Sequence, residues 1–264
     1  GHWRVRFGSY PTIAHGTVHR YRCRVCGKTM GDQTESVHYF AKRRLPLRAV
    51  TDSLMGGTCQ REIARRYGFS PMAVHNAILR LGRQAMAAQT ILLHHLPERP
   101  VVVFDGLRSC VTAQDYPCDI TTVVEPAGEM VLSMSHAVFH RGGRMTDHQR
   151  KRMAAKRAKW KPRPKNVSRS ISLIGQEIAD YLRPPAPHPA RINTDEHPLY
   201  PRMIDTSFVY QPFRRAELLQ HLRISSKAPR TMGNPLFPVN YVDRLIRHRL
   251  KEHTRETIAI GRHA

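Results

Sequence analysis

The sequence predicts an α/β protein in which a mixed β-sheet flanked by helices follows two smaller N-terminal segments. Four short β-prone runs lie at residues 101–105, 119–125, 130–139 and 190–195. Between the third and the fourth run lie two stretches with helical signals, residues 147–159 and 170–182. Short strands that are bounded by Pro, Gly and charged residues and that alternate with helices indicate one sheet covered by helices.

The composition fits a folded protein without a membrane partner. Of the 264 residues 41% are hydrophobic, which is enough for one sizeable core and a smaller module. No run approaches the roughly 18 apolar residues that a membrane span needs, and no secretory signal opens the chain, so we expect a cytoplasmic protein. The five cysteines do not form the pattern of a disulfide framework. The chain starts at Gly1 and stops in a polar stretch, as a fragment would.

The charge balance indicates a polyanionic partner. Forty-three Lys and Arg residues against 20 Asp and Glu residues give a formal net charge of +23. Nucleic acid is the first candidate, because membrane-binding helices carry large apolar anchors that the densest basic stretch here lacks. That stretch, residues 141–165, suits a grip on the phosphate backbone, although a solvated helix face is the alternative. Its candidate DNA contacts are Arg150, Lys151, Lys156 and Arg157.

Residues 1–50 form a basic segment with the features of a zinc knuckle. A strand-like alternation leads into Cys23 and Cys26, whose spacing suits a tight metal-binding turn. This is half of a four-ligand Zn²⁺ site, and the other half is either His15 with His19 or a second Cys pair upstream. A redox role is disfavoured, because the strand-to-helix setting of that motif is missing.

Residues 51–97 carry the pattern of a helix-turn-helix. Apolar residues at helical spacing, Gly68 at a left-handed turn and Ser70 as the cap of a second helix are in register. Such a second helix can lie in the major groove of DNA. The residues expected to face DNA are His75, Asn76 and Arg80. An ordinary helical hairpin is the alternative.

The larger domain, residues 98–264, begins at a proline-marked linker and contains a basic helical insertion, residues 141–183. A short helix at residues 198–204, a fifth strand at residues 207–210 and a closing helix from residue 239 complete it. With the helical insertion counted as one element, the predicted element order is β-β-β-α-β-α-β-α.

Two aspartates, Asp105 and Asp195, stand where the first and fourth strands of this domain are expected to end. An aspartate after a strand is more often a turn former or a helix N-cap. Acids after the first and fourth strands in this element order are, however, the pattern of the RNase H-like nuclease fold, in which those strands are neighbours. Two such carboxylates suit a pair of Mg²⁺ ions that act on a phosphodiester.

Nearly the whole chain resembles the DDE-type insertion-sequence transposases of bacteria. The similar stretches are residues 21–29 (zinc ribbon), 60–81 (helix-turn-helix), 194–200 (second catalytic Asp), 240–247 (catalytic helix) and 255–259 (its basic tail). The resemblance implies binding of double-stranded DNA at transposon ends and in the target, with Mg²⁺-dependent strand cleavage and strand transfer. It also implies a homodimer or larger assembly, associated with the bacterial nucleoid.

One position departs from the family pattern. The resemblance places the third catalytic acid on Asn240, which can ligate a metal ion but adds no charge. Asp243 lies one helical turn later on the same face and is the expected third ligand, ahead of Glu252 and Glu256. Arg247, one further turn along, would then point towards the phosphate. A surface ion pair with a neighbouring arginine is the alternative for Asp243.

The sequence therefore favours one function over two others. The first is a transposase in which Asp105, Asp195 and either Asp243 or Asn240 act in catalysis. The second is a DNA-binding regulator, a domesticated or decayed transposase without catalysis, which Asn240 favours. A structural RNA-binding protein would also suit the charge, but it gives the paired acids no role.

Overall fold

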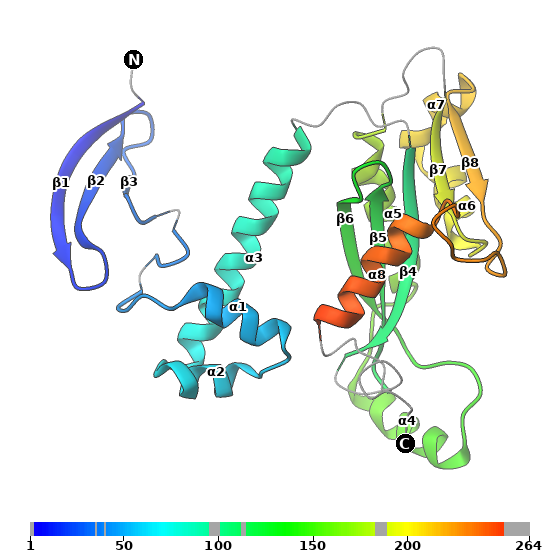
Figure 1. The fold of residues 1–264 in the computed structure, drawn as a ribbon, viewed down its shortest axis with the longest axis horizontal. Coiled ribbons are helices and arrows are strands. Elements are labelled where there is room, and N and C mark those ends of the chain that lie inside the picture. The colour runs from blue at the N-terminus through cyan, green and yellow to red at the C-terminus, as the bar shows by residue number, and fades with distance from the viewer. Residues whose placement is uncertain are drawn as a thin grey trace. The chain divides into compact units, whose positions relative to one another are not determined.

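The computed structural model describes residues 3–34, 36–39, 41–94, 101–111, 115–182 and 189–250. The chain divides into two compact units, residues 1–95 and 96–264 (Figure 1). The predicted linker between Pro97 and Pro100 lies outside the described residues, as do Glu252 and Glu256. Within the described ranges no helix is both long enough and apolar enough to cross a membrane.

The first unit begins with a three-stranded antiparallel sheet. Its strands are β1 (Arg4–Thr12), β2 (Gly16–Cys23) and β3 (Thr29–Gly31), in the order β1-β2-β3. Gly16 turns the chain between β1 and β2 with a φ of 65°, a left-handed conformation that favours glycine. In β1 every residue is at least partly exposed, and in β2 only Val18 is buried. This sheet therefore contributes little apolar core of its own.

Three helices complete the first unit: α1 (Leu47–Met55), α2 (Gln60–Tyr67) and α3 (Pro71–His94). Their apolar faces meet in a core of Leu45, Val50, Ile63, Ala64, Val74 and Ala77. Gly68 ends α2 with a φ of 66°, and the Ser70 hydroxyl accepts a hydrogen bond of 3.1 Å from the Ala73 N–H at the start of α3. The structure thus has the turn and the cap that the sequence predicts, with α1 as an additional helix.

The second unit is built on a five-stranded mixed sheet. Its strands are β4 (Val101–Cys110), β5 (Pro117–Glu125), β6 (Met130–Val138), β7 (Ala190–Thr194) and β8 (Leu219–Arg223). They lie in the order β6-β5-β4-β7-β8, with antiparallel pairing on the β6 side of β4 and parallel pairing on the β8 side. The first strand of this unit is thus central and lies beside the fourth, which is compatible with an RNase H-like core.

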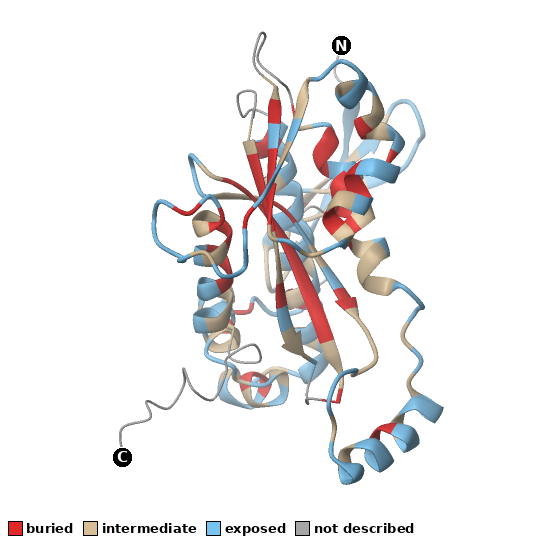
Figure 2. Ribbon diagram, turned by 90° about the vertical axis from the view of Figure 1, so that its right-hand side faces the viewer, coloured by how far each residue is buried: buried red, intermediate tan, exposed pale blue. Residues whose placement is uncertain are grey.

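Helices cover both faces of this sheet. The helices of this unit are α4 (Asp147–Lys159), α5 (Asn166–Ala179), α6 (Leu199–Thr206), α7 (Gln211–Arg215) and α8 (Phe237–Arg249). Figure 1 shows α8 crossing β4 and β5, where it packs on Val103 and Val124. On the opposite face α5 packs on β5 and β6, and the α6 residue Tyr200 meets the ring of Phe104. The central strands are consequently the most buried part of the unit (Figure 2).

The prediction of the fifth strand is wrong. Residues Phe208–Tyr210 form a short 3₁₀ helix, and the fifth strand is β8. The reason is Tyr210, which is fully buried and donates a hydrogen bond from its hydroxyl to the Gly175 carbonyl oxygen, so that this segment packs on α5. The strand β8 gives little sequence signal, because its only apolar residues are Leu219 and Leu222 and it has no β-branched residue.

Gly175 allows α5 and α6 to approach closely. A Cβ atom here would overlap Sδ of Met203 and lie 3.0 Å from its Cγ, and Met203 is only 2% exposed. We expect Gly175→Ala to lower the free energy of unfolding by about 1–3 kcal/mol, the usual cost of overpacking a core. Thermal unfolding followed by circular dichroism measures this, with Gly142→Ala as the matched control, because a Cβ there meets nothing within 4 Å. Equal midpoints for the two variants contradict the expectation.

Candidate functional site

The parallel pairing of β4 and β7 sets two aspartates side by side. Val103 lies opposite Asn193, and the same register continued by two residues sets Asp105 level with Asp195. Because side chains alternate along a strand, Asp105 lies on the same face of the sheet as Val103, which is the face that α8 covers. Two acids ninety positions apart in the sequence thus become neighbours.

Asp105 lies inside its strand and not at its end, because β4 continues to Cys110. The Gly106 N–H donates a hydrogen bond of 2.8 Å to Oδ1 of Asp105. Burial raises the pKa of Asp105 to about 6 against the effect of this hydrogen bond, and the negative charge of Asp195 adds to the increase. The pKa of Asp105 is therefore raised mainly by burial and, to a smaller extent, by the nearby Asp195.

Asp195 directly follows β7 and also shapes the turn after it. Its Oδ1 accepts a hydrogen bond of 2.8 Å from the His197 N–H, which is the bond of an Asx turn. Thr194, the last residue of β7, has its hydroxyl 2.9 Å from Nε2 of His221 on β8. Asp195 therefore has the turn-forming role that is common for an aspartate after a strand.

Asp243 is the third acid near this pair. It lies on the buried side of α8 and is only 9% exposed, so the alternative of a surface position does not hold. Burial and then the charge of Asp105 raise the pKa of Asp243 to about 8, although Arg247 opposes the increase. A buried acid with such a pKa keeps its proton at neutral pH unless a positive charge comes close.

The side chains of Asp243 and Thr122 are buried at this place, and a hydrogen bond from Thr122 acts against the raised pKa of Asp243. Thr122 lies on β5 directly opposite Asp105. Asn240, one turn before Asp243, donates a hydrogen bond of 2.7 Å from its side chain to the Leu236 carbonyl oxygen of its own helix. A buried carboxyl group whose charged neighbours include other acids suits a cation, because a cation offsets their mutual repulsion.

The acids fit a divalent cation without forming a closed cage. Among the residues that the structure describes, no three His, Cys, Asp or Glu side chains are arranged to hold a metal ion. Mg²⁺ is commonly held by one or two carboxylates together with water and substrate phosphates, and a cation offsets the repulsion between neighbouring carboxylates. Asp105 and Asp195 are the pair that fits such an ion, and Asp243 is the acid that would complete the site.

The raised pKa values predict how stability depends on pH. The pKa values of about 6 for Asp105 and about 8 for Asp243 both lie above the ordinary value of 3.8, so the folded chain keeps protons that the unfolded chain releases. The stability that these groups contribute is therefore fully present below about pH 4 and is lost as the pH rises towards 8.

A divalent cation should reverse this loss. We expect Mg²⁺ at tenfold excess over its Kd to raise the free energy of unfolding by about 1.4 kcal/mol at pH 8. At pH 5 both carboxyl groups are largely protonated, and we expect little effect. Thermal unfolding at the two pH values, with and without Mg²⁺, measures the difference. An equal Mg²⁺ effect at both pH values would count against a cation at these acids.

A further acid that the sequence pattern did not indicate, Asp119, lies on the face of the sheet opposite Asp105. It is buried on β5, where Oδ2 lies 2.8 Å from Nε of Arg108. Gly106 leaves room for it, because a Cβ there would lie 3.3 Å from Oδ2 of Asp119 and 3.6 Å from the Tyr200 hydroxyl. Burial and then the charges of the surrounding aspartates, Asp105 first, raise the pKa of Tyr200. The available signal was an Asp inside a run of apolar and β-branched residues.

The basic helix α4 is anchored by one buried carboxylate. Asp115 is only 3% exposed and is surrounded by basic side chains. Its contacts are Nζ of Lys156 at 2.6 Å, Nε of Arg152 at 2.8 Å and Nη1 of Arg141 at 3.6 Å. Hydrogen bonds from Lys156 and Arg152 lower the pKa of Asp115. Part of the charge of this segment is therefore balanced inside the chain.

The four predicted DNA contacts of α4 differ in their surroundings. Lys156 is bound to Asp115, and Arg157 donates a hydrogen bond of 3.0 Å to a backbone carbonyl. Arg150 pairs at 2.8 Å with the aspartate three residues before it. Lys151 is exposed, which makes it the residue of this set best placed to meet a phosphate.

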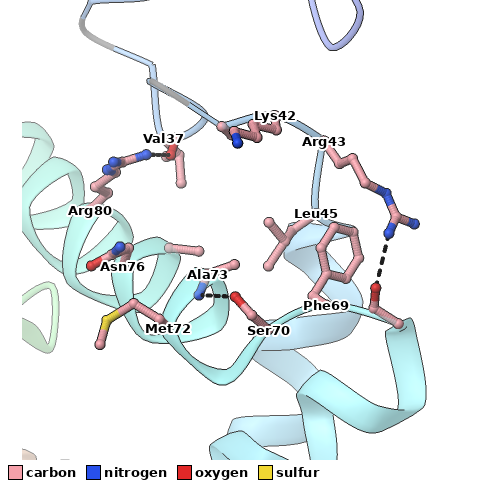
Figure 3. A pocket seen from close by; sticks show the side chains of 13 residues that line it. Val37, Lys42, Arg43, Leu45, Phe69, Ser70, Met72, Ala73, Asn76 and Arg80 are labelled. Atoms are coloured by element: carbon pink, nitrogen blue, oxygen red, sulfur yellow. Dashed lines mark hydrogen bonds between the residues drawn. The ribbon is translucent and has the colours of Figure 1, made fainter.

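Arg80 on α3 ties a preceding segment to the helix. Its Nη1 donates a hydrogen bond of 3.2 Å to the carbonyl oxygen of Val37 (Figure 3) and another to the carbonyl oxygen of Tyr39. Asn76 and Arg80 line a pocket of about 370 Å³ between residues 37–45 and the first turns of α3. His75 and Asn76 are exposed. Of the three predicted DNA contacts on α3, Arg80 thus has a structural role that its sequence position did not indicate.

Cys23 and Cys26 stand at the tight turn after β2. Gly27 has a φ of 68° and donates its N–H to the Cys23 carbonyl oxygen at 3.1 Å. Hydrogen bonds from the backbone N–H groups of Cys26 and the residue before it lower the pKa of Cys23. The predicted partner His19 has its Nδ1 3.0 Å from a nitrogen of Arg6, and in the described ranges no third ligand joins the two cysteines.

These observations define a mixed α/β protein with paired acids on its central strands. No family model matches the chain, and no curated protein matches it. Among solved structures, the chain is similar to one in the cryoEM structure of the simian T-cell lymphotropic virus intasome in complex with PP2A regulatory subunit B56 gamma, with 14% identity and a TM-score of 0.25. The match covers 71% of this chain and 54% of that chain.

Proposed function

We propose that this chain is a DDE-type transposase that binds transposon-end DNA and carries out Mg²⁺-dependent strand cleavage and strand transfer. The observation that supports this most is the parallel register of β4 and β7, which sets Asp105 level with Asp195. The buried Asp243 on α8 adds a third acid whose pKa responds to Asp105. Grouped carboxylates in a chain with a net charge of +23 suit chemistry on a phosphodiester.

In this proposal Asp105 and Asp195 hold two Mg²⁺ ions. Such ions, when bound, activate the attacking oxygen and stabilise the leaving oxygen of a phosphodiester. Asp243 keeps a proton on its carboxyl group at neutral pH and releases it when positive charge approaches. Arg230 acts against the raised pKa of Asp105 and Arg247 against that of Asp243, and in this proposal Arg247 contacts the phosphate.

Binding of double-stranded DNA is assigned to both units. The exposed His75 and Asn76 on α3 would reach the bases of the transposon ends, and the exposed Lys151 on α4 would contact the phosphate backbone. A Zn²⁺ ion at Cys23 and Cys26 would need ligands beyond those in the described residues. Action on paired DNA ends requires at least a homodimer.

A DNA-binding regulator derived from such an element is the second candidate. Asn240 favours it, because an amide replaces the carboxylate that the family resemblance places there. In that case the acids would persist without catalysis, and the DNA-binding residues of α3 and α4 would carry the function.

The test is nicking of supercoiled DNA by the full chain. We expect relaxed and linear products with Mg²⁺ or Mn²⁺ and none with EDTA. The Asp105→Asn/Asp195→Asn double variant, purified alongside, controls for a contaminating nuclease. Equal nicking by both proteins removes the catalytic proposal, and DNA binding without nicking by either supports the regulator.

A further inference from the structure

The exposed sheet of the first unit interleaves arginines with aromatic rings. In the register of β1 and β2, Val5 lies opposite Arg22, so Arg20, Arg22 and Phe7 share one face, which we call the Phe7 face. The guanidinium carbons of Arg20 and Arg22 lie 5.4 Å and 5.7 Å from the centre of the Phe7 ring. Phe7 itself is 45% exposed. A large aromatic side chain is thus held in solvent between two cations.

A pocket adjoins the Phe7 face. It has a volume of about 320 Å³ and is lined by Tyr10, Arg20, Thr29, Met30, Gly31, Gln33, Thr34 and Tyr39. The side-chain amide of Gln33 donates a hydrogen bond of 3.0 Å to the Tyr10 hydroxyl. Its Oε1 is buried and has no hydrogen-bond partner within the described residues. The pocket therefore offers aromatic walls, one cation and one free acceptor.

The positive charge of residues 3–34 favours an anionic ligand. Residues 3–34 contain six Lys and Arg residues and a single acid, Asp32. The carboxylate of Asp32 accepts a hydrogen bond of 3.0 Å from the His19 N–H, so it is engaged in the turn after the sheet. An apolar protein partner would leave these cations unpaired, whereas phosphates would neutralise them.

We propose that the Phe7 face binds single-stranded nucleic acid. One base stacks on the Phe7 ring beside the guanidinium planes, and the next base enters the pocket, where Oε1 of Gln33 accepts a hydrogen bond from an exocyclic amino group. Aromatic rings and guanidinium planes stack on bases of any sequence, but they reach base faces only in an unpaired strand. This proposal goes beyond duplex binding and does not depend on catalysis by the second unit.

The opposite face of the same sheet provides a matched control. There Arg4 lies over the ring of Tyr21, with its guanidinium carbon 4.5 Å from the ring centre. Arg4→Ala removes the same charge as Arg22→Ala, and Tyr21→Ala removes an aromatic ring as Phe7→Ala does. Only the variants of the Phe7 face are expected to affect stacking.

Fluorescence anisotropy with the full chain tests the proposal, using a labelled oligo(dC), its RNA counterpart and a duplex. We expect Phe7→Ala to weaken single-strand binding about tenfold without changing its salt dependence, and Phe7→Trp to retain binding. Arg22→Ala should reduce the slope of log affinity against log salt concentration by about 0.7. The tighter of the two single strands identifies the natural ligand.

Three results would overturn the proposal. The first is equal weakening by Phe7→Ala and Tyr21→Ala. The second is an equal effect of Phe7→Ala on single-stranded and duplex DNA. The third is self-association of the chain through the Phe7 face, seen in sedimentation and abolished by Phe7→Ala, without single-strand binding. Because single-strand binding is measured in EDTA, where no nicking is expected, failure of the catalytic proposal is distinguishable from failure of this one.

Discussion

Replacing Asp105 with Asn is expected to lower Mg²⁺-dependent nicking of DNA at least a thousandfold, and Asp195→Asn should have a similar effect. Each substitution removes one negative charge from the pair that the β4–β7 register sets side by side. A loss of this size corresponds to about 4 kcal/mol of transition-state stabilisation, which is within the range that bound metal ions supply. Initial nicking rates at a fixed Mg²⁺ concentration measure it.

The thermal stability of the Asp105→Asn variant shows whether its loss of nicking activity comes from misfolding. Asp105 has a raised pKa, so its ionised form weakens the folded state, and Asp105→Asn should raise the thermal midpoint at pH 8 and not lower it. Asp147→Asn is the matched control, because its side chain is 87% exposed on α4 and, among the described residues, pairs with Arg150. Wild-type rates in Asp105→Asn, or an equal loss in Asp147→Asn, would rule out the assignment.

The proximity of Asp105 and Asp195 could be predicted from the sequence, because local signals and sheet topology coincide there. Asp195 follows a short apolar run, and β7 ends directly before it. Asp105 sits in a strongly apolar run, yet its strand continues to Cys110, because Gly106 and the residues after it pair with β5. Pattern alone identifies the acid, but it does not show that a partner strand extends beyond it.

Other features depend on contacts that no local pattern contains. Tyr210 directs a β-prone segment onto α5 through one hydrogen bond to Gly175, and the polar β8 takes the place at the sheet edge. Arg80 is bound by carbonyl oxygens more than forty residues away in the chain. Asp119 fits on the face of the sheet opposite Asp105 because Gly106 leaves room for it there. Each is a tertiary effect that overrides local propensity.

The identity of the third acid is open to a test in which activity and stability change in opposite directions. Asp243→Asn is expected to lower the nicking rate about a hundredfold, because it removes the only carboxylate that α8 contributes in the described residues to the face carrying Asp105. At pH 9, where the Asp243 carboxyl group is ionised in the folded state, the same change should raise the free energy of unfolding by about 1–3 kcal/mol. At pH 5 the two proteins should be equally stable.

Comparison with Asn240→Ala distinguishes a catalytic site from the decayed site of a DNA-binding regulator. It removes an amide that is bonded to the Leu236 carbonyl oxygen and leaves the charge of the site unchanged, so we expect a loss of activity well below that of Asp243→Asn. If Asn240→Ala abolishes nicking and Asp243→Asn does not, Asn240 is the ligand and Asp243 is a buried acid that only destabilises the fold. If Asp243→Asn stabilises the chain while neither variant changes DNA binding and the wild type does not nick, the site belongs to a regulator. In that case the buried Asp243 carboxylate lowers the free energy of unfolding, because no cation offsets its charge.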